Sequence, residues 1–206
     1  MNLAIQSSME DRSNSLLEVN SATFSPLAQS KRTSTTWYCH FQQVPTFLAK
    51  AKRLLGLKNV EQMEEPQIVR YKTGQEFSWH YDEIPAAQLE NGGQRTATLL
   101  VYLNTLPSTG DGGGTVFRDL TNGSKNNQQL TMKPKQGSAL LFFPSFANGT
   151  PDERTLHKGE VVNSTKDTKM IAQMWFHQRL YRPILPEGNS QDDAIPAVQN
   201  KEKELG

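Results

Sequence analysis

The stretch Gln67–Asp82, QIVRYKTGQEFSWHYD, carries the strongest signal for the fold. Its first part is rich in β-branched and aromatic residues, a Thr-Gly pair marks a turn, and a second short run follows. We therefore expect strands at 67–72 and 76–82. Because positions i and i+2 of a strand face the same side, His80 and Asp82 are expected to converge on one point.

Similar short runs continue along the chain, separated by clusters of Gly, Asn, Asp and Pro. They predict further strands at 96–103, 114–118, 138–143, 159–163 and 169–177. Before them, the apolar spacing from Val44 to Leu55 predicts an amphipathic helix, with Pro45 in its first turn and Gly56 at its end. Strands after a helical start, without β-α-β alternation, predict an α+β, mainly β domain built as a sandwich, jelly roll or barrel.

The length of 206 residues leaves room for one domain with tails. The strand pattern assigns this domain to 32–182. Residues 1–31 are rich in Ser, Asn and Gln and are expected to form an N-terminal extension, with one short helix around Leu16, Leu17 and Val19. The segment 183–206 alternates Pro, Gly and charge, which predicts a flexible C-terminal tail.

Charge and cysteine content exclude several classes of function. Lys and Arg number 22 against 21 Asp and Glu, so a net charge of +1 offers no global attraction for nucleic acid or an anionic membrane. No apolar run is long enough for a membrane span or a secretory signal, and a soluble protein is expected. The single cysteine, Cys39, excludes an internal disulfide, so a metal site must use His and carboxylates.

His80 and Asp82 supply two candidate metal ligands, and His157 is the candidate third. A His and an Asp this close more often share an ordinary hydrogen bond. Two His and one carboxylate, however, form the facial triad of non-haem Fe(II) oxygenases, which leaves coordination positions open for a chelating cosubstrate and O₂.

The run 169–177 adds a lysine in an apolar strand. Because side chains alternate along a strand, two faces are expected. One face carries Lys169, Ile171, Gln173, Trp175 and His177, and the opposite face carries Met170, Ala172, Met174 and Phe176. Lys169 either lies on an exposed edge, where charge discourages aggregation, or forms a salt bridge to a ligand carboxylate inside a barrel.

Four later stretches also matter here: GGQRTATLLVYLN (92–104), GGTVF (113–117), KQGSALLF (135–142) and LHKGEVVNSTKDTKMIAQMW (156–175). Together with Gln67–Asp82, they resemble the catalytic domain of the prolyl 4-hydroxylases. These are Fe(II)/2-oxoglutarate dioxygenases. The segment Arg32–Ser34 also resembles one that precedes their catalytic core. The resemblance implies a double-stranded β-helix, a jelly roll of the cupin type, supported by N-terminal helices.

The resemblance also implies roles position by position. His80, Asp82 and His157 match the iron ligands, and Lys169 matches the residue that binds the distal carboxylate of 2-oxoglutarate. The interval from His157 to Lys169 is longer than usual, which a short insertion in the turn at 163–168 explains. Three further residues fall where related enzymes line the cosubstrate pocket: Tyr71, Tyr102 and Thr115.

Substrate recognition is assigned in the same way to Arg95, Trp175 and His177, which fall where the family contacts its peptide. Each has a structural alternative: a surface charge for Arg95, a core filler for Trp175 and a hydrogen-bonded polar residue for His177. The glycine-rich loop 106–114 is a candidate lid over a bound peptide.

The implied activity is hydroxylation of proline in peptides or proteins. 2-Oxoglutarate and O₂ would serve as cosubstrates and ascorbate as reductant, with succinate and CO₂ as products. Asp82 favours hydroxylation over halogenation, because related halogenases lack this carboxylate. The alternatives are the same chemistry on free proline, another amino acid or a small molecule, and a non-catalytic metal-binding barrel that binds a ligand or partner. Zinc-dependent hydrolysis lacks an evident general base beyond the triad.

The chain departs from the family in two places. Few residues precede Arg32, so we expect either a shortened N-terminal support or a missing start. His157 is followed by Lys158, Gly159 and Glu160, whereas secreted eukaryotic members often carry a cysteine here. The absent cysteine favours an intracellular, cytoplasmic member.

Overall fold

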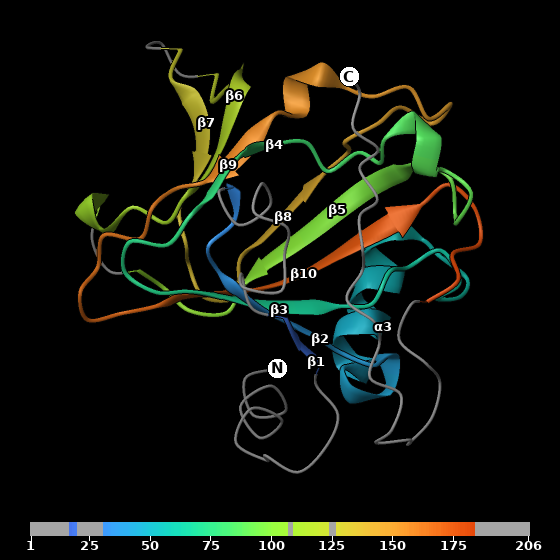
Figure 1. Ribbon diagram of the computed structural model, residues 1–206, viewed down its shortest axis with the longest axis horizontal. Helices are drawn as coiled ribbons and strands as arrows, with labels where there is room; N and C mark the ends of the chain where they lie inside the picture. The colour runs from blue at the N-terminus through green and yellow to red at the C-terminus, as the bar shows by residue number, and fades with distance from the viewer. Residues whose placement is uncertain (1–16, 20–30, 107–108, 124–126, 184–206) are drawn as a thin grey trace, which may run out of the picture.

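The computed structural model describes residues 17–19, 31–106, 109–123 and 127–183, and its strands form two antiparallel sheets (Figure 1). The larger sheet has the order β1-β2-β3-β10-β5-β8 and the smaller one β4-β9-β6-β7. The strands of the larger sheet are β1 (Leu17–Val19), β2 (Thr35–Tyr38), β3 (Gln67–Tyr71), β10 (Lys169–His177), β5 (Arg95–Tyr102) and β8 (Ala139–Phe142). Those of the smaller sheet are β4 (Phe77–His80), β9 (His157–Gly159), β6 (Thr115–Thr121) and β7 (Gln129–Met132). This arrangement confirms the predicted jelly roll.

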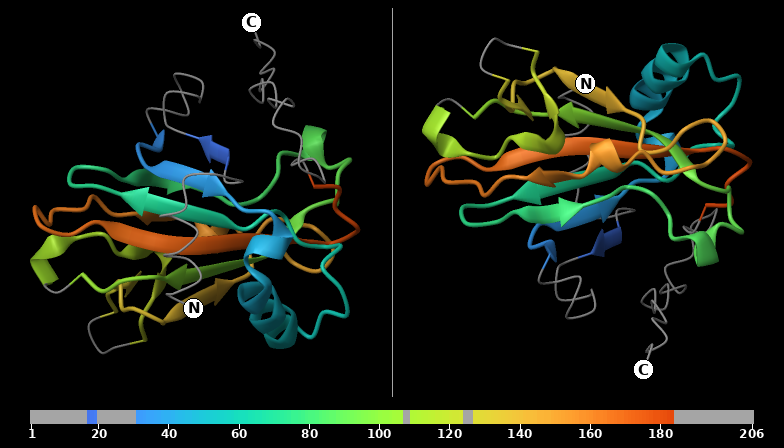
Figure 2. Two further views of the ribbon diagram at one scale, coloured as in Figure 1. Left: turned by 90° about the horizontal axis from the view of Figure 1, so that it is seen from below. Right: turned by 90° about the horizontal axis from the view of Figure 1, so that it is seen from above.

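Helix α3 (Pro45–Leu55) covers the outer face of the larger sheet. Pro45 occupies its first turn, and Gly56 ends it in the left-handed conformation with a φ of 65°. The smaller sheet lies on the other side of the larger sheet, as Figure 1 shows, and Figure 2 gives views of the two sheets from below and from above. The other helical segments are single 3₁₀ turns: η2 (Phe41–Gln43), η3 (Ala86–Gln88), η4 (Thr109–Asp111) and η5 (Glu153–Thr155).

Strand β10 separates two apolar clusters by its alternation. Ala172, Met174 and Phe176 pack toward α3, where Phe47, Leu48 and Ala51 complete the helix-side cluster. Ile171 points the other way, into an interior cluster shared by both sheets. That cluster also contains Val69, Tyr71, Leu100, Tyr102, Leu106 and Val162, with Phe77 and Met132 of the smaller sheet packed against it. The interior cluster is the one that borders the candidate site.

The predicted strand at 76–82 ends early, at His80, because His80 pairs with His157 and the antiparallel partner strand β9 begins at that residue. Asp82 therefore follows the strand instead of lying on it. The strand predicted at 159–163 is β9, which begins at His157 and ends at Gly159. The short helix expected around Leu17 is wrong: Leu17–Val19 pairs with β2 as a strand.

Two further strands carried too little pattern to be predicted. Strand β2 is only four residues long, and β7 is polar and is a strand because it pairs with β6. Within the described ranges, no helix has both the length and the apolar character needed to cross a membrane. The rest of the N-terminal extension, 1–16 and 20–30, and the tail 184–206 lie outside the described residues, so their assignments stay predictions.

Replacing Met174 tests the helix-side cluster. Its side chain is 0% exposed, so Met174→Ala should lower the free energy of unfolding by about 2–5 kcal/mol through lost burial and a residual cavity. The matched control is Leu54→Ala on α3, whose side chain is 57% exposed and whose loss should change stability by no more than about 0.5 kcal/mol. Urea unfolding of the metal-free chain measures both, and equal effects would contradict the assigned core.

Candidate metal centre

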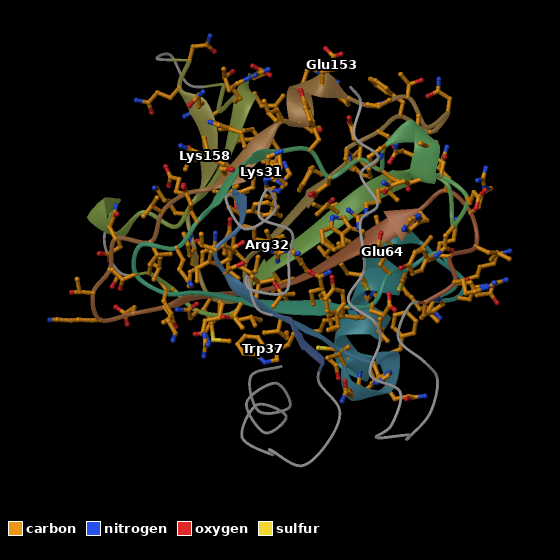
Figure 3. The ribbon with its side chains drawn as sticks, viewed as in Figure 1. Lys31, Arg32, Trp37, Glu64, Glu153 and Lys158 are labelled. Carbon is orange, nitrogen blue, oxygen red and sulfur yellow. The ribbon has the colours of Figure 1, made fainter. Side chains whose placement is uncertain are left out.

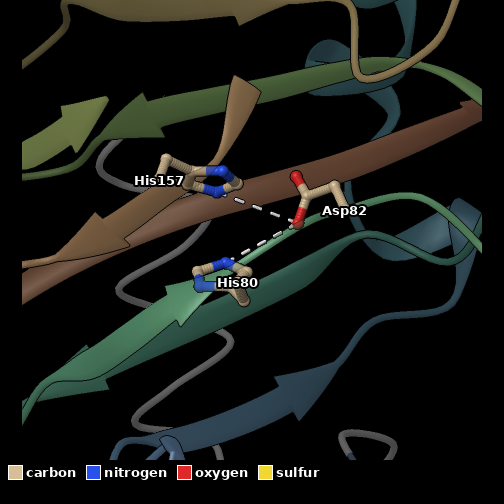
Figure 4. Close-up of side chains that lie close together, drawn as sticks. All are labelled: His80, Asp82 and His157. Carbon is tan, nitrogen blue, oxygen red and sulfur yellow. Dashed lines mark ion pairs between the residues drawn. The ribbon is translucent and has the colours of Figure 1, made fainter. Parts of the chain in front are cut away.

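Three predicted ligands converge between the ends of neighbouring strands. His80 ends β4, His157 begins β9, and the two residues are cross-strand partners. Asp82 lies between them: its Oδ1 is 3.7 Å from Nε2 of His80 and 3.8 Å from Nε2 of His157 (Figure 4). The candidate ligand atoms all lie within 4.8 Å of one another. Three donors are thus directed at one position.

Backbone carbonyls orient both imidazoles. Nδ1 of His80 lies 2.7 Å from the carbonyl oxygen of Ser78, and Nδ1 of His157 lies 2.9 Å from that of Thr155. Because a carbonyl only accepts, each Nδ1 carries the proton and each Nε2 keeps its lone pair for a ligand. A hydrogen bond from the ring nitrogen that does not bind the metal is typical of metal-binding imidazoles.

The carboxylate of Asp82 is held on its other oxygen. Thr98 donates its hydroxyl to Oδ2 at 2.8 Å, which leaves Oδ1 facing the histidines. Burial opposes ionisation of Asp82, but nearby His157, His80 and Arg95 outweigh it and lower the pKa of this carboxyl. Burial, assisted by His157 and opposed by Asp82, lowers the pKa of His80 to about 3. A neutral imidazole and an ionised carboxylate are the forms that bind a divalent cation.

Aromatic rings surround the histidines. Phe77 stacks on His80 with ring centroids 3.5 Å apart, and the rings of Phe117 and Phe142 lie 5.5 and 4.9 Å from that of His157. These apolar walls restrict water around the ligands, which strengthens electrostatic interactions inside the site. The donor set and its surroundings fit Fe(II).

The four residues predicted for the cosubstrate pocket also lie together. Nζ of Lys169 is 4.8 Å from the ring centroid of Tyr71 and 6.0 Å from that of Tyr102. The hydroxyl of Tyr102 lies 2.8 Å from Oγ1 of Thr115 and donates to the carbonyl of Met132 at 3.0 Å. The pocket joins the triad through Phe77, which packs against the interior cluster and stacks on His80.

Lys169 is 1% exposed and forms no salt bridge with any carboxylate among the described residues. Burial lowers its pKa to about 7, against the opposing effect of Glu160. A buried ammonium without an anionic partner is unfavourable. This position is therefore suited to the carboxylate of a ligand.

Arg95 is part of a charged cluster, not an isolated surface charge. It donates to Glu64 through Nε at 2.5 Å and through a terminal nitrogen at 2.8 Å, and to the backbone carbonyl of Asp82 at 3.2 Å. Its guanidinium lies 4.0 Å from the ring centroid of Trp175, which is buried with its indole nitrogen unpaired. Arg95 thus connects the metal centre to Glu64.

His177 lies at the far side of this charged cluster. Its Nε2 is 2.6 Å from a Glu64 oxygen and its Nδ1 is 3.2 Å from the carbonyl of Gly93, so both ring nitrogens have partners. Glu64, labelled in Figure 3 beside the end of β10, accepts from both Arg95 and His177. This geometry matches the structural alternative for His177, and a substrate contact stays a prediction.

The described part of the loop 106–114 is bound to the segment after β9. Asn163 donates its backbone N–H to Asp111 at 2.8 Å, and Gly113 donates to Val161 at 3.0 Å. Gly112 has a φ of 65°, and a Cβ there would lie 2.1 Å from the carbonyl oxygen of Val161, so the close approach requires glycine. Residues 107–108 lie outside the described part, and the lid stays a prediction.

Two polar contacts of the site were not predicted from the sequence. Thr98 bonds the metal-binding carboxylate, and Glu64 bonds Arg95 and His177. The available signal for Glu64 was its place in an acidic pair that Pro66 separates from a buried strand. Thr98 is one of several threonines in strands and carried no signal of its own.

Comparison with known families identifies a family model that matches this chain. The model described as the 2OG-Fe(II) oxygenase superfamily matches residues 66–177, which include the triad, Lys169 and the whole of β10. Two curated relatives from Arabidopsis thaliana are prolyl 4-hydroxylase 2, 33% identical, and prolyl 4-hydroxylase 13, 35% identical. The alignments cover 64% and 57% of this chain and 48% and 44% of the relatives. The chain spans about half the length of these relatives.

Solved structures show the same similarity. The viral collagen prolyl hydroxylase of Paramecium bursaria Chlorella virus-1, crystallised as a 2OG complex, is 25% identical and superposes with a TM-score of 0.58. The alignment covers 79% of this chain and 96% of that one. A Pseudomonas putida prolyl-4-hydroxylase is 16% identical and superposes with a TM-score of 0.57. The alignment covers 86% of this chain and 84% of that one, and at this low identity the similarity supports the fold alone.

Replacing Thr98 tests the support of the metal-binding carboxylate. Thr98→Val keeps the shape but removes the hydrogen bond to Asp82, and should weaken divalent-metal binding by about tenfold to a hundredfold. Anaerobic calorimetry with Fe(II) or Mn(II) measures the affinity. The control is Thr96→Val, whose hydroxyl donates to the carbonyl of Phe176 instead. Unchanged affinity in Thr98→Val would contradict this role.

The buried ammonium of Lys169 predicts a pH-dependent difference in stability. Its pKa is about 7 in the folded chain against an ordinary value of 10.5, so between these pH values the unfolded chain binds more protons. The destabilisation is complete below the folded pKa and disappears as the pH rises toward the ordinary value. Lys169→Met should therefore stabilise the metal-free chain most under mildly acidic conditions and progressively less toward alkaline pH.

Urea unfolding of wild type and Lys169→Met over this pH range measures the difference. Lys135→Met, at an exposed lysine, should show no such trend. A difference between Lys169→Met and wild type that stayed constant with pH would count against a shifted lysine.

Proposed function

This chain belongs to the 2OG-Fe(II) oxygenase superfamily, and on that basis we propose that it hydroxylates prolyl residues of peptides or proteins, using Fe(II), 2-oxoglutarate and O₂. The observation that carries the proposal is one interior holding both a His-Asp-His triad, of which Asp82 and His157 are buried, and a buried lysine that has no carboxylate partner in the described part of the chain. The similarity to prolyl 4-hydroxylases supports proline as the target.

His80, Asp82 and His157 would hold Fe(II) through two imidazole nitrogens and one carboxylate oxygen. When bound, Fe(II) activates O₂ and couples the decarboxylation of 2-oxoglutarate to succinate and CO₂ with hydroxylation of the substrate. The protein orients these ligands through Thr98 and two backbone carbonyls, and Phe77 restricts water beside His80. Positioning and exclusion of water are therefore its main contributions.

Lys169 would bind the distal carboxylate of 2-oxoglutarate. Its pKa of about 7 leaves the amino group only partly protonated near neutral pH, so a carboxylate that binds there favours the charged form and draws a proton into the site. Tyr71 and Tyr102 form the walls beside this amino group, and Thr115 holds the Tyr102 hydroxyl. These four residues form the proposed cosubstrate pocket.

Arg95 and Trp175 are the proposed substrate-contacting residues. Arg95 lies beside the backbone of Asp82, and the unpaired indole N–H of Trp175 is a donor that a peptide carbonyl can use after a small rearrangement. The proposed contact from His177 would require one of its two present hydrogen bonds to exchange. Ascorbate as reductant and a cytoplasmic location rest on the family resemblance and stay predictions.

Mass spectrometry of candidate peptides tests the activity. Wild type with Fe(II), 2-oxoglutarate and O₂ should add one oxygen to a proline-containing peptide and form succinate in step. Asp82→Ala and His157→Ala should lose turnover because they lose the metal. Lys169→Met should raise the concentration of 2-oxoglutarate required, because it removes the partner of a buried carboxylate.

Parallel reactions distinguish the substrate classes. Lys135→Met, altered at an exposed lysine outside the site, should behave as wild type. Hydroxylation of free proline without any peptide would replace the peptide proposal with small-molecule chemistry. Metal-loaded wild type that neither binds nor decarboxylates 2-oxoglutarate would exclude the dioxygenase activity altogether.

A further inference from the structure

Two buried glutamine side chains form a pair on the inner face of the larger sheet. Nε2 of Gln173 donates to Oε1 of Gln67 at 3.0 Å, and the two residues are cross-strand partners on β10 and β3. Gln67 is 2% exposed and Gln173 is 7% exposed. Burying an amide is unfavourable unless its polar atoms are hydrogen-bonded, so each polar atom of this pair should have a partner.

The glutamine pair keeps unused capacity for hydrogen bonds. A bond between two amides uses one oxygen and one N–H, which leaves the Gln67 amino group and the Gln173 oxygen without a partner among the described residues. Neither atom is among the described polar atoms that are both fully enclosed and unpaired, so both border open space. The pair therefore presents one donor and one acceptor to the interior of the barrel.

The position of the pair along β10 places it beside the metal centre. Ile171, an apolar residue on the same face, separates Gln173 from Lys169. In the other direction, Trp175 follows two residues later, about 7 Å along the strand, and pairs with Thr98, which bonds the metal-binding carboxylate. Diagonal neighbours on paired strands lie within reach of long side chains, so Gln173 lies beside Thr98. The indole N–H of Trp175, buried and unpaired, is a further free donor on this face.

A free donor together with a free acceptor matches a peptide group and not a carboxylate. A carboxylate only accepts hydrogen bonds, so it would leave the Gln173 oxygen unpaired and facing a negative charge. A peptide group presents a C=O and an N–H together. Of the two peptide groups that flank a proline, the one before it has no N–H, whereas the one after it has both. The pair is thus suited to the peptide group that follows a proline.

We propose that Gln67 and Gln173 determine specificity for peptide-bound proline: the Gln67 amino group donates to the proline carbonyl, and the Gln173 oxygen accepts from the N–H of the next residue. The target rests on the proposed function, whereas the unused donor and acceptor rest on the contacts alone. Free proline carries a carboxylate at this point, which supplies no N–H. It is therefore discriminated against, because a buried polar group left unpaired costs more than one hydrogen bond contributes.

Three N-acetylated peptides of one sequence, each with proline as its last residue, test this pairing. The first ends in an N-methylamide, which keeps the C=O and the N–H, the second in a methyl ester, which keeps only the C=O, and the third in a free carboxylate. Binding to Mn(II)-loaded protein with 2-oxoglutarate is measured by anaerobic calorimetry, so that no turnover occurs. Wild type should bind the N-methylamide about tenfold more tightly than the ester, and the free acid most weakly.

Single variants assign the donor and the acceptor. Gln173→Met keeps the length of the side chain but removes the acceptor, so it should bind the N-methylamide and the ester equally, within about twofold. Gln67→Met should weaken both by about fivefold and keep the preference, because amide and ester share the carbonyl. The control Gln129→Met, at an exposed glutamine of β7 whose amide donates to the carbonyl of Arg118, should bind as wild type. Gln173→Leu replaces Gln173→Met if the latter does not fold.

The role of the glutamine pair and the proposed function fail in different ways. Wild type that hydroxylates the peptide but binds all three forms equally overturns the role of the pair and leaves the proposed function intact. A preference for the N-methylamide that persists in Gln173→Met has the same consequence. Wild type that neither binds nor hydroxylates any of the three peptides overturns the proposed function and the role of the pair with it.

Discussion

The structure depends on keeping one ionised carboxylate, that of Asp82, inside an apolar interior. A buried carboxylate needs several partners, and those of Asp82 come from separate elements: His80 from β4, His157 from β9 and Thr98 from β5. Strands β4 and β9 belong to the smaller sheet and β5 to the larger one. The two sheets must therefore meet at a defined position for the carboxylate to be stabilised, and that same position brings the donors together.

Strand β10 carries a polar residue of the site at each of its two ends. Lys169 at its first residue lies in the interior cluster, and His177 at its last residue bonds Glu64, which bonds Arg95 beside Asp82. The apolar residues on the opposite face pack against α3. The helix thus stabilises the strand from outside, while the inner face carries the charged groups, so packing and chemistry are divided between the two faces.

Much of this arrangement could be predicted from local pattern and family resemblance. The alternation over 169–177 matches β10 residue by residue, and the helix ends at the predicted Gly56. Local pattern did not show that Asp82 lies beyond its strand, because the end of β4 is set by the residue at which its partner β9 begins. The strand at Leu17–Val19 depends in the same way on β2. Thr98 and Glu64 are common residue types whose roles come from tertiary contacts that no local window contains.

The hydrogen bonds from the two imidazoles to backbone carbonyls bear on how this site tolerates mutation. Each acceptor belongs to the main chain two residues before its histidine, so the side chains at Ser78 and Thr155 can change without removing it. Substitutions at these neighbouring positions therefore leave the orientation of both rings unchanged. Residues around the metal centre can then change to fit new substrates while the two histidines keep their direction. Insertions or deletions that shift the backbone next to either histidine are the changes such a lineage would have to avoid.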